Sequence, residues 1–527
     1  MDFSLLLGKR CKMPGVIKST FYAGCLLVAT VGNAQSKIEL SNAPATHTIS
    51  KHIYGHFAEH LGRCIYDGFY VGDTNKTIRH ANGLRTDVID ALKALKVPNL
   101  RWPGGCFADS YHWKDGIGPK SSRPTMINRW WGATVEDNSF GTHEFLELCG
   151  KIGAEPYLAG NVGSGTVKEL SDWVDYVNVP ANKGPMGMLR VQNGRTEPWN
   201  VRYWGVGNET WGCGGNMTPQ HYANLYRQYA TFMADWDNSA KIFRVVSGAN
   251  GDDMNWTEVM MREVPLNMME GLSLHHYAVI DWSAKGSATR FTEADYFKTM
   301  QQAWKMDDIV IRHSAIMDKY DPQKKVALVV DEWGGWYDVE PGTNPGHLFQ
   351  QNTMRDAMIA GMTLNIFNNH SKRVRIANLA QTVNVLQAVI LTSQEKMILT
   401  PTYHVMQMYN VHQDATLLPL TLQSSDYVMA GQKLPAISAS ASRNSAGVTH
   451  ISLVNIDYTK PHTVSVDLKS TYKSVNGTII KSATAQDCNT FEKPDFIKPV
   501  PFKESKLAGS TLTLTLPPFS VVVLALQ

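Results

Sequence analysis

Two glutamates follow short apolar runs that have the composition of buried β-strands. Residues 201–206 are β-branched and aromatic, and Asn208 and Glu209 come just after the glycine that ends this run. Residues 326–330 are purely aliphatic, and Glu332 follows them after one aspartate. Two carboxyl groups at strand ends are the minimal equipment for cleaving a glycosidic bond, one as acid/base and one as nucleophile. The pattern therefore predicts glycosidase chemistry, although either glutamate could instead form a structural ion pair.

The elements that position these glutamates are expected to be the strands of a barrel. Extended apolar runs alternate with amphipathic segments as far as about residue 400, and Thr218 followed by Pro219 has the composition of a helix start. Eight strands interleaved with helices predict a closed parallel barrel, with its catalytic groups at the carboxyl ends of the strands. The expected strands are residues 53–57, 99–102, 155–159, 201–206, 243–247, 272–274, 326–330 and 375–379.

Beyond about residue 405 the apolar residues alternate with a period of two. Clusters of Pro, Gly, Asn and Lys separate these runs. Such spacing is typical of an antiparallel β-sandwich. The clearest runs are residues 450–457, 462–468, 510–516 and 519–526.

Several longer motifs occur in an order that resembles a known family. They are IYGHFAEHLGRCIYDGFYVG at 53–72, RWPGGCFADSYHWKDGIGP at 101–119, LSLHHY at 272–277, DEWGGWYD at 331–338 and NLAQTVNVLQA at 378–388. Together with Asn208 and Glu209, they resemble the α-L-arabinofuranosidases of glycoside hydrolase family 51, which are barrel glycosidases of clan A. The likeness covers nearly everything after Gln35.

The resemblance implies a particular architecture. The fold class is α/β, a (β/α)8 TIM barrel with a C-terminal antiparallel β-sandwich of jelly-roll type. In this family the segment that precedes the barrel completes the sandwich. The implied division is a signal peptide at 1–34, a strand segment at 35–50, the barrel at 51–400 and the sandwich at 401–527.

The resemblance also implies roles for individual residues. Glu209 would be the acid/base and Glu332 the nucleophile, which the residues alone do not distinguish. Asn208 would bind the sugar hydroxyl next to the anomeric carbon. Arg101 could orient the nucleophile or be only an ion-pair partner, and Trp336 could line the pocket or be core. The further candidates for substrate contact are Glu59, Cys106, His275, Tyr277 and Gln381.

Cys106 departs from a common version of the family motif, which has asparagine there. A thiol is a weak donor and acceptor, so its contact with a sugar is expected to be weaker than that of an amide. Five cysteines follow residue 34, so at least one stays unpaired, and none has the paired spacing of a metal site. Residues 56–60 read H-x-x-E-H, as in inverted zinc peptidases. They leave a strand rather than lie on a helix, so we expect no metal and no cofactor.

The composition excludes some partners. Lys and Arg number 50 against 47 Asp and Glu, so no basic surface for nucleic acid is indicated. Fourteen tryptophans and 20 tyrosines suit sugar binding, although most are expected in the core. We expect no membrane partner, and family habit implies a homo-oligomer, often a hexamer.

The amino end has the composition of a secretory signal. Basic residues between 9 and 18 precede an apolar run at 21–31, and Gly32-Asn33-Ala34 follows it. This order predicts cleavage after Ala34 and a secreted or periplasmic protein, with Met13 as an alternative start. Cys25 could mark a lipoprotein, but it precedes most of the apolar run instead of following it.

The sequence thus predicts a retaining exo-glycosidase. Its expected reaction is release of terminal, non-reducing α-L-arabinofuranose from arabinan, arabinoxylan and their oligosaccharides, which are plant cell-wall materials. One alternative is another activity on the same barrel, endoglucanase or β-xylosidase, since fold does not dictate substrate. The other is a non-catalytic carbohydrate-binding protein, which would lack one of the two carboxylates.

Overall fold

The computed structural model describes residues 35–527 apart from 42–46, 235 and 238–241. The expected signal segment, 1–34, lies outside the described residues. In the described part no helix is both long enough and apolar enough to cross a membrane.

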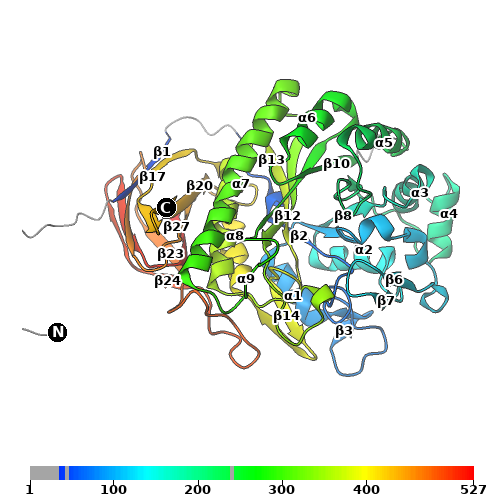
Figure 1. Ribbon diagram of the computed structural model, residues 1–527, viewed down its shortest axis with the longest axis horizontal. Helices are drawn as coiled ribbons and strands as arrows, with labels where there is room; N and C mark the ends of the chain where they lie inside the picture. The colour runs from blue at the N-terminus through cyan, green and yellow to red at the C-terminus, as the bar shows by residue number, and fades with distance from the viewer. Residues whose placement is uncertain (1–34, 42–46, 235, 238–241) are drawn as a thin grey trace, which may run out of the picture. The chain divides into compact units, whose positions relative to one another are not determined.

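A closed barrel of eight parallel strands forms the first and larger part of the described chain (Figure 1). The predicted fold class is confirmed. Successive strands pair in chain order, and the last strand pairs with the first to close the ring. The strands are β2 Gly55–Phe57, β5 Asn99–Trp102, β8 Glu155–Gly160, β9 Tyr203–Val206, β10 Phe243–Asn250, β11 Gly271–Ala278, β12 Ala327–Gly335 and β13 Val374–Ala380.

Amphipathic helices alternate with the barrel strands, as the period of their apolar residues requires. Thr218 caps α5 by accepting from the His221 amide, and Pro219 occupies the first turn, so this helix starts where its sequence predicts. The helices are α1 Thr86–Leu95, α2 Thr142–Ile152, α3 Val167–Asn178, α4 Pro185–Gln192, α5 Pro219–Phe232, α6 Met254–Glu263, α7 Glu293–Tyr320, α8 Met354–Asn369 and α9 Pro401–Tyr409.

Short hairpins lie in the connections between these elements. The longest of the early connections joins β5 to α2, and it contains the hairpin β6–β7. The hairpin strands are β3 His80–Ala81, β4 Leu84–Arg85, β6 Met126–Asn128, β7 Thr134–Glu136, β14 Ile390–Ser393, β15 Lys396–Leu399, β18 Asp426–Met429 and β19 Gln432–Pro435.

The C-terminal part of the described chain, together with the amino-terminal strand, forms two packed sheets in which all pairs but one are antiparallel. One has the strand order β17-β1-β22-β26-β25 and the other β16-β20-β21-β27-β23-β24. The amino-terminal strand β1 lies inside the first sheet, antiparallel to β17 and parallel to β22. The strands are β1 Ser36–Leu40, β16 Thr416–Leu417, β17 Leu420–Gln423, β20 Ile437–Arg443, β21 Thr449–Asn455, β22 His462–Asp467, β23 Val475–Ile480, β24 Val500–Phe502, β25 Ser505–Ala508, β26 Thr511–Leu516 and β27 Ser520–Leu526.

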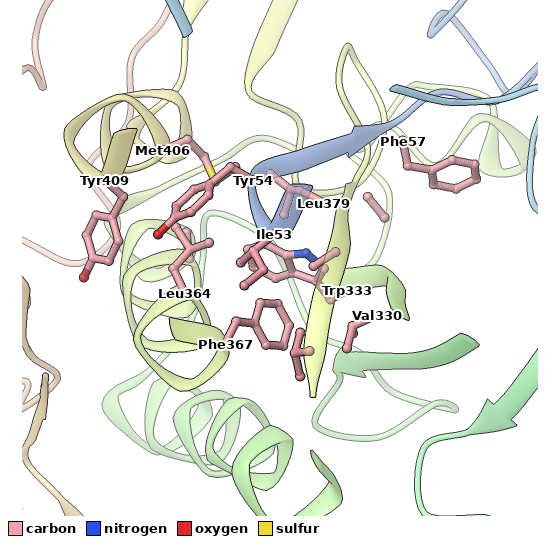
Figure 2. Packing of buried hydrophobic residues seen from close by; sticks show 14 of the residues in the cluster. Ile53, Tyr54, Phe57, Val330, Trp333, Leu364, Phe367, Leu379, Met406 and Tyr409 are labelled. Atoms are coloured by element: carbon pink, nitrogen blue, oxygen red, sulfur yellow. The ribbon is translucent and has the colours of Figure 1, made fainter. Parts of the chain in front are cut away.

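Helix α8 joins the core of the barrel to the sandwich. It is buried along almost its whole length, because one side packs on β12 and the other on β20 and β21. Phe367 of α8 meets Trp333 of β12 edge to face, with ring centroids 5.5 Å apart (Figure 2). Across the other side, Asn365 donates to the Ser438 hydroxyl oxygen at 3.2 Å. Because Trp333 follows Glu332 directly, this packing holds the strand that carries the glutamate.

Candidate active site

Both predicted glutamates face one cavity at the carboxyl end of the barrel. Its volume is about 590 Å³, within the range of small-molecule sites. Arg101 and Asn208 are buried behind the residues that line it. The predicted site residues in its wall are Glu59, Cys106, Glu209, His275, Tyr277, Glu332, Trp336 and Gln381.

Glu332 lies inside strand β12 rather than just past its end. The strand stays paired with β11 beyond the expected limit, so that Glu332 lies opposite His275. Its Oε1 accepts from Arg101 Nη1 at 2.9 Å, and its Oε2 accepts from the Tyr277 hydroxyl at 2.8 Å. A carboxylate with a guanidinium and a hydroxyl as donors is stabilised in its ionised form.

Arg101 connects the two strand ends that carry the predicted chemistry. Its Nη2 donates to Asn208 Oδ1 at 2.6 Å, while Nη1 holds Glu332. Its Nε also lies 3.6 Å from Asp331 Oδ2, so the guanidinium is a buried ion-pair partner as well. The two interpretations from the sequence, orienting residue and ion-pair partner, therefore describe the same contacts.

Glu209 has the backbone conformation of a sharp strand-end turn. Its φ of 43° lies in the left-handed region, which is sparsely populated by non-glycine residues and is frequent at active sites. Burial and the nearby charge of Glu332 raise the pKa of Glu209, while His275 and Arg101 lower it. The net direction is upward, which favours the protonated form of this side chain.

His275 lies between the carboxyl groups of the cavity. Its Nδ1 is 2.8 Å from Glu209 Oε1 and 3.6 Å from Glu332 Oε2, and its Nε2 is 3.2 Å from Asp331 Oδ1. Burial lowers the pKa of His275, but the charge of Glu332 and the hydrogen bonds to Asp331 and Glu209 outweigh it and raise the pKa to about 10. The ring is therefore an imidazolium that offsets part of the negative charge.

Glu59 forms the floor of the cavity opposite the acid/base candidate. Its carboxyl group accepts from the amides of Gly105 and Phe107 at 3.2 and 3.1 Å, and from Trp131 Nε1 at 2.8 Å. Gln381 Nε2 donates to its other oxygen at 3.0 Å. Burial and the charge of Glu332 raise the pKa of Glu59 to about 7 against these donors. Trp131 was not predicted, and only the Trp130-Trp131 pair in a loop pointed to it.

Gly105 allows the backbone to pass close to the carboxylates. A Cβ at this position would lie 3.0 Å from Glu332 Oε1 and 3.4 Å from Glu59 Oε1. A side chain would push against groups that cannot withdraw, because both carboxyl groups are held by hydrogen bonds. This close approach is a physical reason for glycine in the motif RWPGGC.

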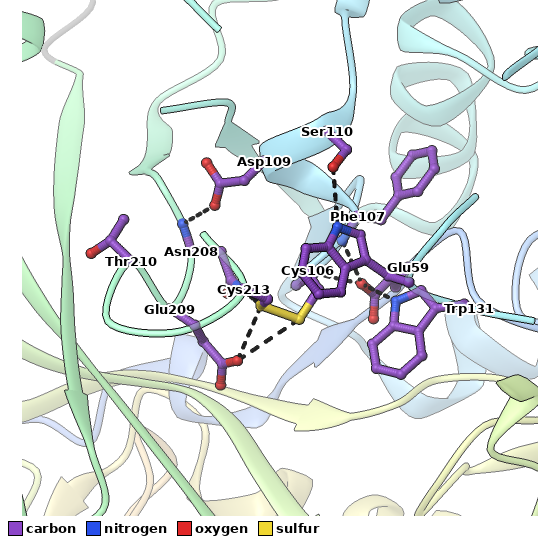
Figure 3. The surroundings of a disulfide bond; sticks show 12 residues. Glu59, Cys106, Phe107, Asp109, Ser110, Trp131, Asn208, Glu209, Thr210 and Cys213 are labelled. Carbon is purple, nitrogen blue, oxygen red and sulfur yellow. Dashed lines mark hydrogen bonds between the residues drawn. A yellow bond between two sulfur atoms is a disulfide. The ribbon is translucent and has the colours of Figure 1, made fainter. Parts of the chain in front are cut away.

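Cys106 is not the free thiol that the sequence analysis expected. It forms a disulfide with Cys213, with the two Cα atoms 5.4 Å apart, a usual separation for such a bond (Figure 3). Cys213 lies in the loop after Glu209, so the bond ties the β5 and β9 loops together. The sulfur atoms of Cys213 and Cys106 lie 3.5 and 4.0 Å from Glu209 Oε2. Sequence spacing could not pair them because 107 residues separate the two cysteines.

Asp109 is a further residue that the sequence analysis missed. Its Oδ1 accepts from the amides of Val162 and Gly163 at 2.7 and 2.8 Å, and its Oδ2 accepts from the Asn208 amide at 2.8 Å. Burial raises the pKa of Asp109 to about 6. The only sequence signal for Asp109 was its position within the motif at 101–119. No local pattern indicated that its carboxyl group would bind the backbone amides of two other loops, an arrangement that we call a backbone clamp.

An aromatic series leads from the carboxylates outward. Tyr277 meets Trp336 with ring centroids 5.1 Å apart, and Trp336 meets Trp282 at 5.4 Å. Trp336 lines the cavity and also packs against the core, so both interpretations of it describe real contacts. Trp282 is 59% exposed.

The H-x-x-E-H residues do not form a ligand set in the described chain. His56 lies within the barrel strand β2, and His60 Nδ1 lies 3.3 Å from Glu136 Oε2 on the neighbouring hairpin. The groups of three potential ligands found among the described residues are Cys106 with Glu209 and Cys213, and Glu209 with His275 and Glu332.

A closed parallel barrel with two glutamates facing one cavity defines the class of barrel glycoside hydrolases. Comparison with known proteins specifies the family. Residues 91–295 match the family described as the α-L-arabinofuranosidase 1 domain, and residues 331–520 match the α-L-arabinofuranosidase C-terminal domain. A curated relative from Bacteroides ovatus, described as an intracellular exo-α-L-arabinofuranosidase, is 52% identical over 91% of this chain and 93% of its own length.

Solved structures agree with this assignment. The family 51 arabinofuranosidase from Xanthomonas axonopodis pv. citri superposes with a TM-score of 0.91 at 46% identity, covering 94% of this chain and all of that one. An α-L-arabinofuranosidase from Thermotoga maritima, solved with arabinose, gives 0.81 at 30% identity, covering 93% and 99%. The chain belongs to glycoside hydrolase family 51, the α-L-arabinofuranosidases, as its motifs predicted.

The prediction of a secreted or periplasmic protein is wrong. It is contradicted by the Bacteroides ovatus relative, which is described as intracellular. The prediction depended only on the order of basic, apolar and small residues in segment 1–34. Such an order is compositional, and it does not by itself specify export.

Proposed function

We propose that this enzyme is a retaining, exo-acting α-L-arabinofuranosidase with Glu332 as nucleophile and Glu209 as acid/base. The substrates we propose are terminal, non-reducing α-L-arabinofuranosyl groups of arabinan, arabinoxylan and arabino-oligosaccharides. The exo-activity in the description of the Bacteroides ovatus relative supports this choice.

The closeness of the two carboxyl groups is the observation that carries the mechanism. One oxygen of Glu209, one of Glu332 and a ring nitrogen of His275 all lie within 4.8 Å of one another. Retaining glycosidases hold their carboxyl groups about 5–5.5 Å apart, whereas inverting enzymes need about 6.5–9.5 Å to admit a water molecule. The spacing therefore supports a double displacement with a covalent intermediate.

The surroundings of the two glutamates support the division of their roles. Glu332 accepts from Arg101 and Tyr277, which favours the ionised form that a nucleophile needs. Glu209 has a raised pKa, which favours the protonated form that an acid needs. In the first step Glu332 attacks the anomeric carbon while Glu209 gives its proton to the leaving oxygen. In the second, Glu209 takes a proton from water, which displaces Glu332 from the sugar.

The remaining residues would hold the sugar. Asn208, fixed by Arg101 through its Oδ1, would use its amide on the hydroxyl next to the anomeric carbon, a contact that strengthens in the transition state. Glu59 and Gln381 would bind other hydroxyls from the cavity floor, and Trp336 would provide an apolar wall. The contribution proposed for Cys106 becomes van der Waals contact from a disulfide sulfur, because a disulfide has no hydrogen to donate.

A panel of nitrophenyl glycosides tests the substrate assignment. We expect hydrolysis of the α-L-arabinofuranoside to exceed that of the β-xylopyranoside and β-glucopyranoside. In the presence of methanol, NMR of the first-formed methyl arabinofuranoside should show the α configuration of the substrate. A dominant β-xylosidase or glucanase activity would contradict the assignment, and a first-formed β product would contradict retention.

We further propose that the chain forms a homo-oligomer, with a hexamer as the expected form. On the β6–β7 hairpin, Ile127 and Val135 are paired directly and are 58% and 67% exposed. Exposed apolar residues that cluster are typical of interaction surfaces. Light scattering on the purified protein measures the mass, and a monomer at micromolar concentration would contradict the proposal.

A further inference from the structure

Two sulfur atoms and a carboxyl oxygen meet at the edge of the catalytic cavity. The sulfur atoms of Cys106 and Cys213 and an oxygen of Glu209 all lie within 4.8 Å of one another (Figure 3). All three side chains are half-buried, and Cys106 and Glu209 line the cavity. A small reductant or ion that enters the cavity therefore reaches them.

We propose that opening the Cys106–Cys213 disulfide creates a binding site for a thiophilic divalent cation such as Zn²⁺ or Cd²⁺. Both thiolates and the Glu209 carboxylate would be its ligands. The inhibition that follows from this site depends on the function proposed for Glu209, whereas the binding itself does not.

The chemistry of opening and loading is balanced with a dithiol as reductant. The dithiol supplies two electrons and two protons, the S–S bond breaks, and the reductant becomes a cyclic disulfide. Each cysteine sulfur is then a thiol. Cation binding displaces both thiol protons to solvent, because the thiolate is the form that coordinates metals.

The geometry suits a tetrahedral cation with one open position. Zinc–thiolate bonds of about 2.3 Å place two sulfur ligands roughly 3.8 Å apart in a tetrahedral site. The sulfur atoms already lie 3.5 and 4.0 Å from Glu209 Oε2, so mainly their mutual separation must grow. Rotation about the Cα–Cβ bonds can supply this change, and Cys213 lies between two glycines, Gly212 and Gly214.

Two protein sulfurs and a carboxylate satisfy the preference of Zn²⁺ and Cd²⁺ for soft ligands, with water in the fourth position. His275 is engaged by Glu209 Oε1 at 2.8 Å, on the other oxygen of the carboxyl group. The remaining cysteines of the described chain, Cys64, Cys149 and Cys488, are unpaired whether this disulfide is open or closed. They serve as an internal reference, since among the described cysteines only Cys106 and Cys213 differ between the two forms.

Direct cation binding tests the proposal without measuring activity. The full-length protein is prepared in an oxidised form, with oxidised dithiothreitol, and in a reduced form, with a phosphine under argon, and both are desalted. Each is titrated with CdCl₂ while the ultraviolet thiolate-to-cadmium absorption is followed. We expect the reduced form to bind one more Cd²⁺ per chain, with an absorption that the oxidised form lacks. Equal binding by the two forms would overturn the proposal.

Variants assign the site. Reduced Cys213→Ser should lose the additional Cd²⁺ absorption, whereas reduced Cys488→Ser should keep it, because that thiol lies elsewhere. Loss of the absorption in Cys488→Ser, or its retention in Cys213→Ser, would place the cation at another site. Circular dichroism of each variant excludes loss of fold as the cause.

Activity with Zn²⁺ is the second measurement. Zinc should slow hydrolysis of an unactivated arabino-oligosaccharide by the reduced enzyme by about tenfold or more, because proton transfer by a positioned acid is typically worth 10²- to 10⁴-fold. The oxidised enzyme should be unaffected, and a chelator should restore the reduced one. Cadmium binding without zinc inhibition would support the cation site but contradict the proposed acid/base role of Glu209.

Discussion

At the scale of single residues, the three carboxyl groups around the His275 ring are offset by two cations, His275 itself and Arg101. Glu209, Glu332 and Asp331 surround the His275 ring, and Arg101 contacts Glu332 and Asp331 from behind. Burial and the nearby charge of Glu332 both raise the pKa of Glu209. The two glutamates differ in their partners, which are Arg101 and Tyr277 for Glu332 and His275 for Glu209.

Removal of each glutamate should have a different effect. We expect Glu332→Ala to be inactive on every arabinofuranoside, because both chemical steps need the nucleophile. Glu209→Ala should lose about 10²- to 10⁴-fold on oligosaccharides but keep a measurable first step on nitrophenyl arabinofuranoside, whose leaving group needs no proton.

Azide provides the control on this assignment. It should accelerate Glu209→Ala by attacking the covalent intermediate, and the arabinofuranosyl azide should have the α configuration of the substrate. NMR of the azide product measures this. A retained azide from Glu332→Ala, together with an inverted azide from Glu209→Ala, would reverse the two roles.

The pH profile should depend on Glu209. An acid works only while protonated, so activity should fall as pH rises through its pKa, which burial and then the charge of Glu332 raise. The other charged groups facing it, His275 and Arg101, lower that pKa but do not titrate with it near neutrality. The alkaline limb of kcat/KM on an arabino-oligosaccharide, whose leaving group needs the proton, should therefore disappear in Glu209→Ala. An unchanged alkaline limb would assign it to another group.

At the scale of elements, three strand ends are fastened to one another by a single buried side chain. Asp109 follows β5 and accepts from amides after β8 and after β9, including that of Asn208. Glu209 directly follows Asn208. Its left-handed backbone conformation persists only because the surrounding structure fixes it. The clamp therefore fixes the backbone directly before Glu209, the acid/base that we propose.

Asp109→Ala should lower kcat more than it raises KM. We expect a loss of about 10- to 100-fold in kcat, since misplacement of a catalytic group by about 1 Å can cost 10²-fold. A positioning role also predicts a larger loss on oligosaccharides than on nitrophenyl arabinofuranoside, because only the former depend on the proton from Glu209. Asp90→Ala, at an exposed position of α1, is the matched control. Equal losses on the two substrates would indicate a purely structural role.

At the scale of the whole molecule, the first strand of the described chain is built into a sheet of the C-terminal sandwich. Strand β1 pairs with β17 and β22, which lie 380 residues or more further along the chain. Ile38 points into the core, 1% exposed, and Glu39 points outward. The sandwich thus depends on a segment that precedes the barrel, and helix α8 links the sandwich core to the strand of Glu332.

Ile38→Ala should destabilise the protein by about 2–5 kcal/mol, the usual cost of emptying a buried aliphatic site. The midpoint of thermal unfolding should fall accordingly. Glu39→Ala, one residue away on the exposed face, should change the free energy of unfolding by less than about 0.5 kcal/mol. Calorimetry measures both, and equal midpoints for the two variants would contradict the burial of β1.

Local sequence patterns predict much of this organisation. The periods of the apolar residues distinguish barrel helices and strands from the alternating runs of the sandwich, because burial of one face acts on neighbouring residues. The order of the motifs assigned Glu209 and Glu332 to the correct strands. It also assigned the chain to its family. Segment 1–34 shows the limit of composition, since its implied location is contradicted by the intracellular relative.

Only the closed barrel decides which distant residues touch. The Cys106–Cys213 bond, the clamp by Asp109 and the contact of Trp131 with Glu59 join segments whose local sequences contain no sign of one another. Gln381 reaches Glu59 across 322 residues because β13 pairs with β2. Periodicity reports which face of an element is buried, but strand order and register determine what it is buried against. The tertiary structure therefore determines the distances between the reactive groups, whereas the sequence by itself determined which chemical groups are available to the site.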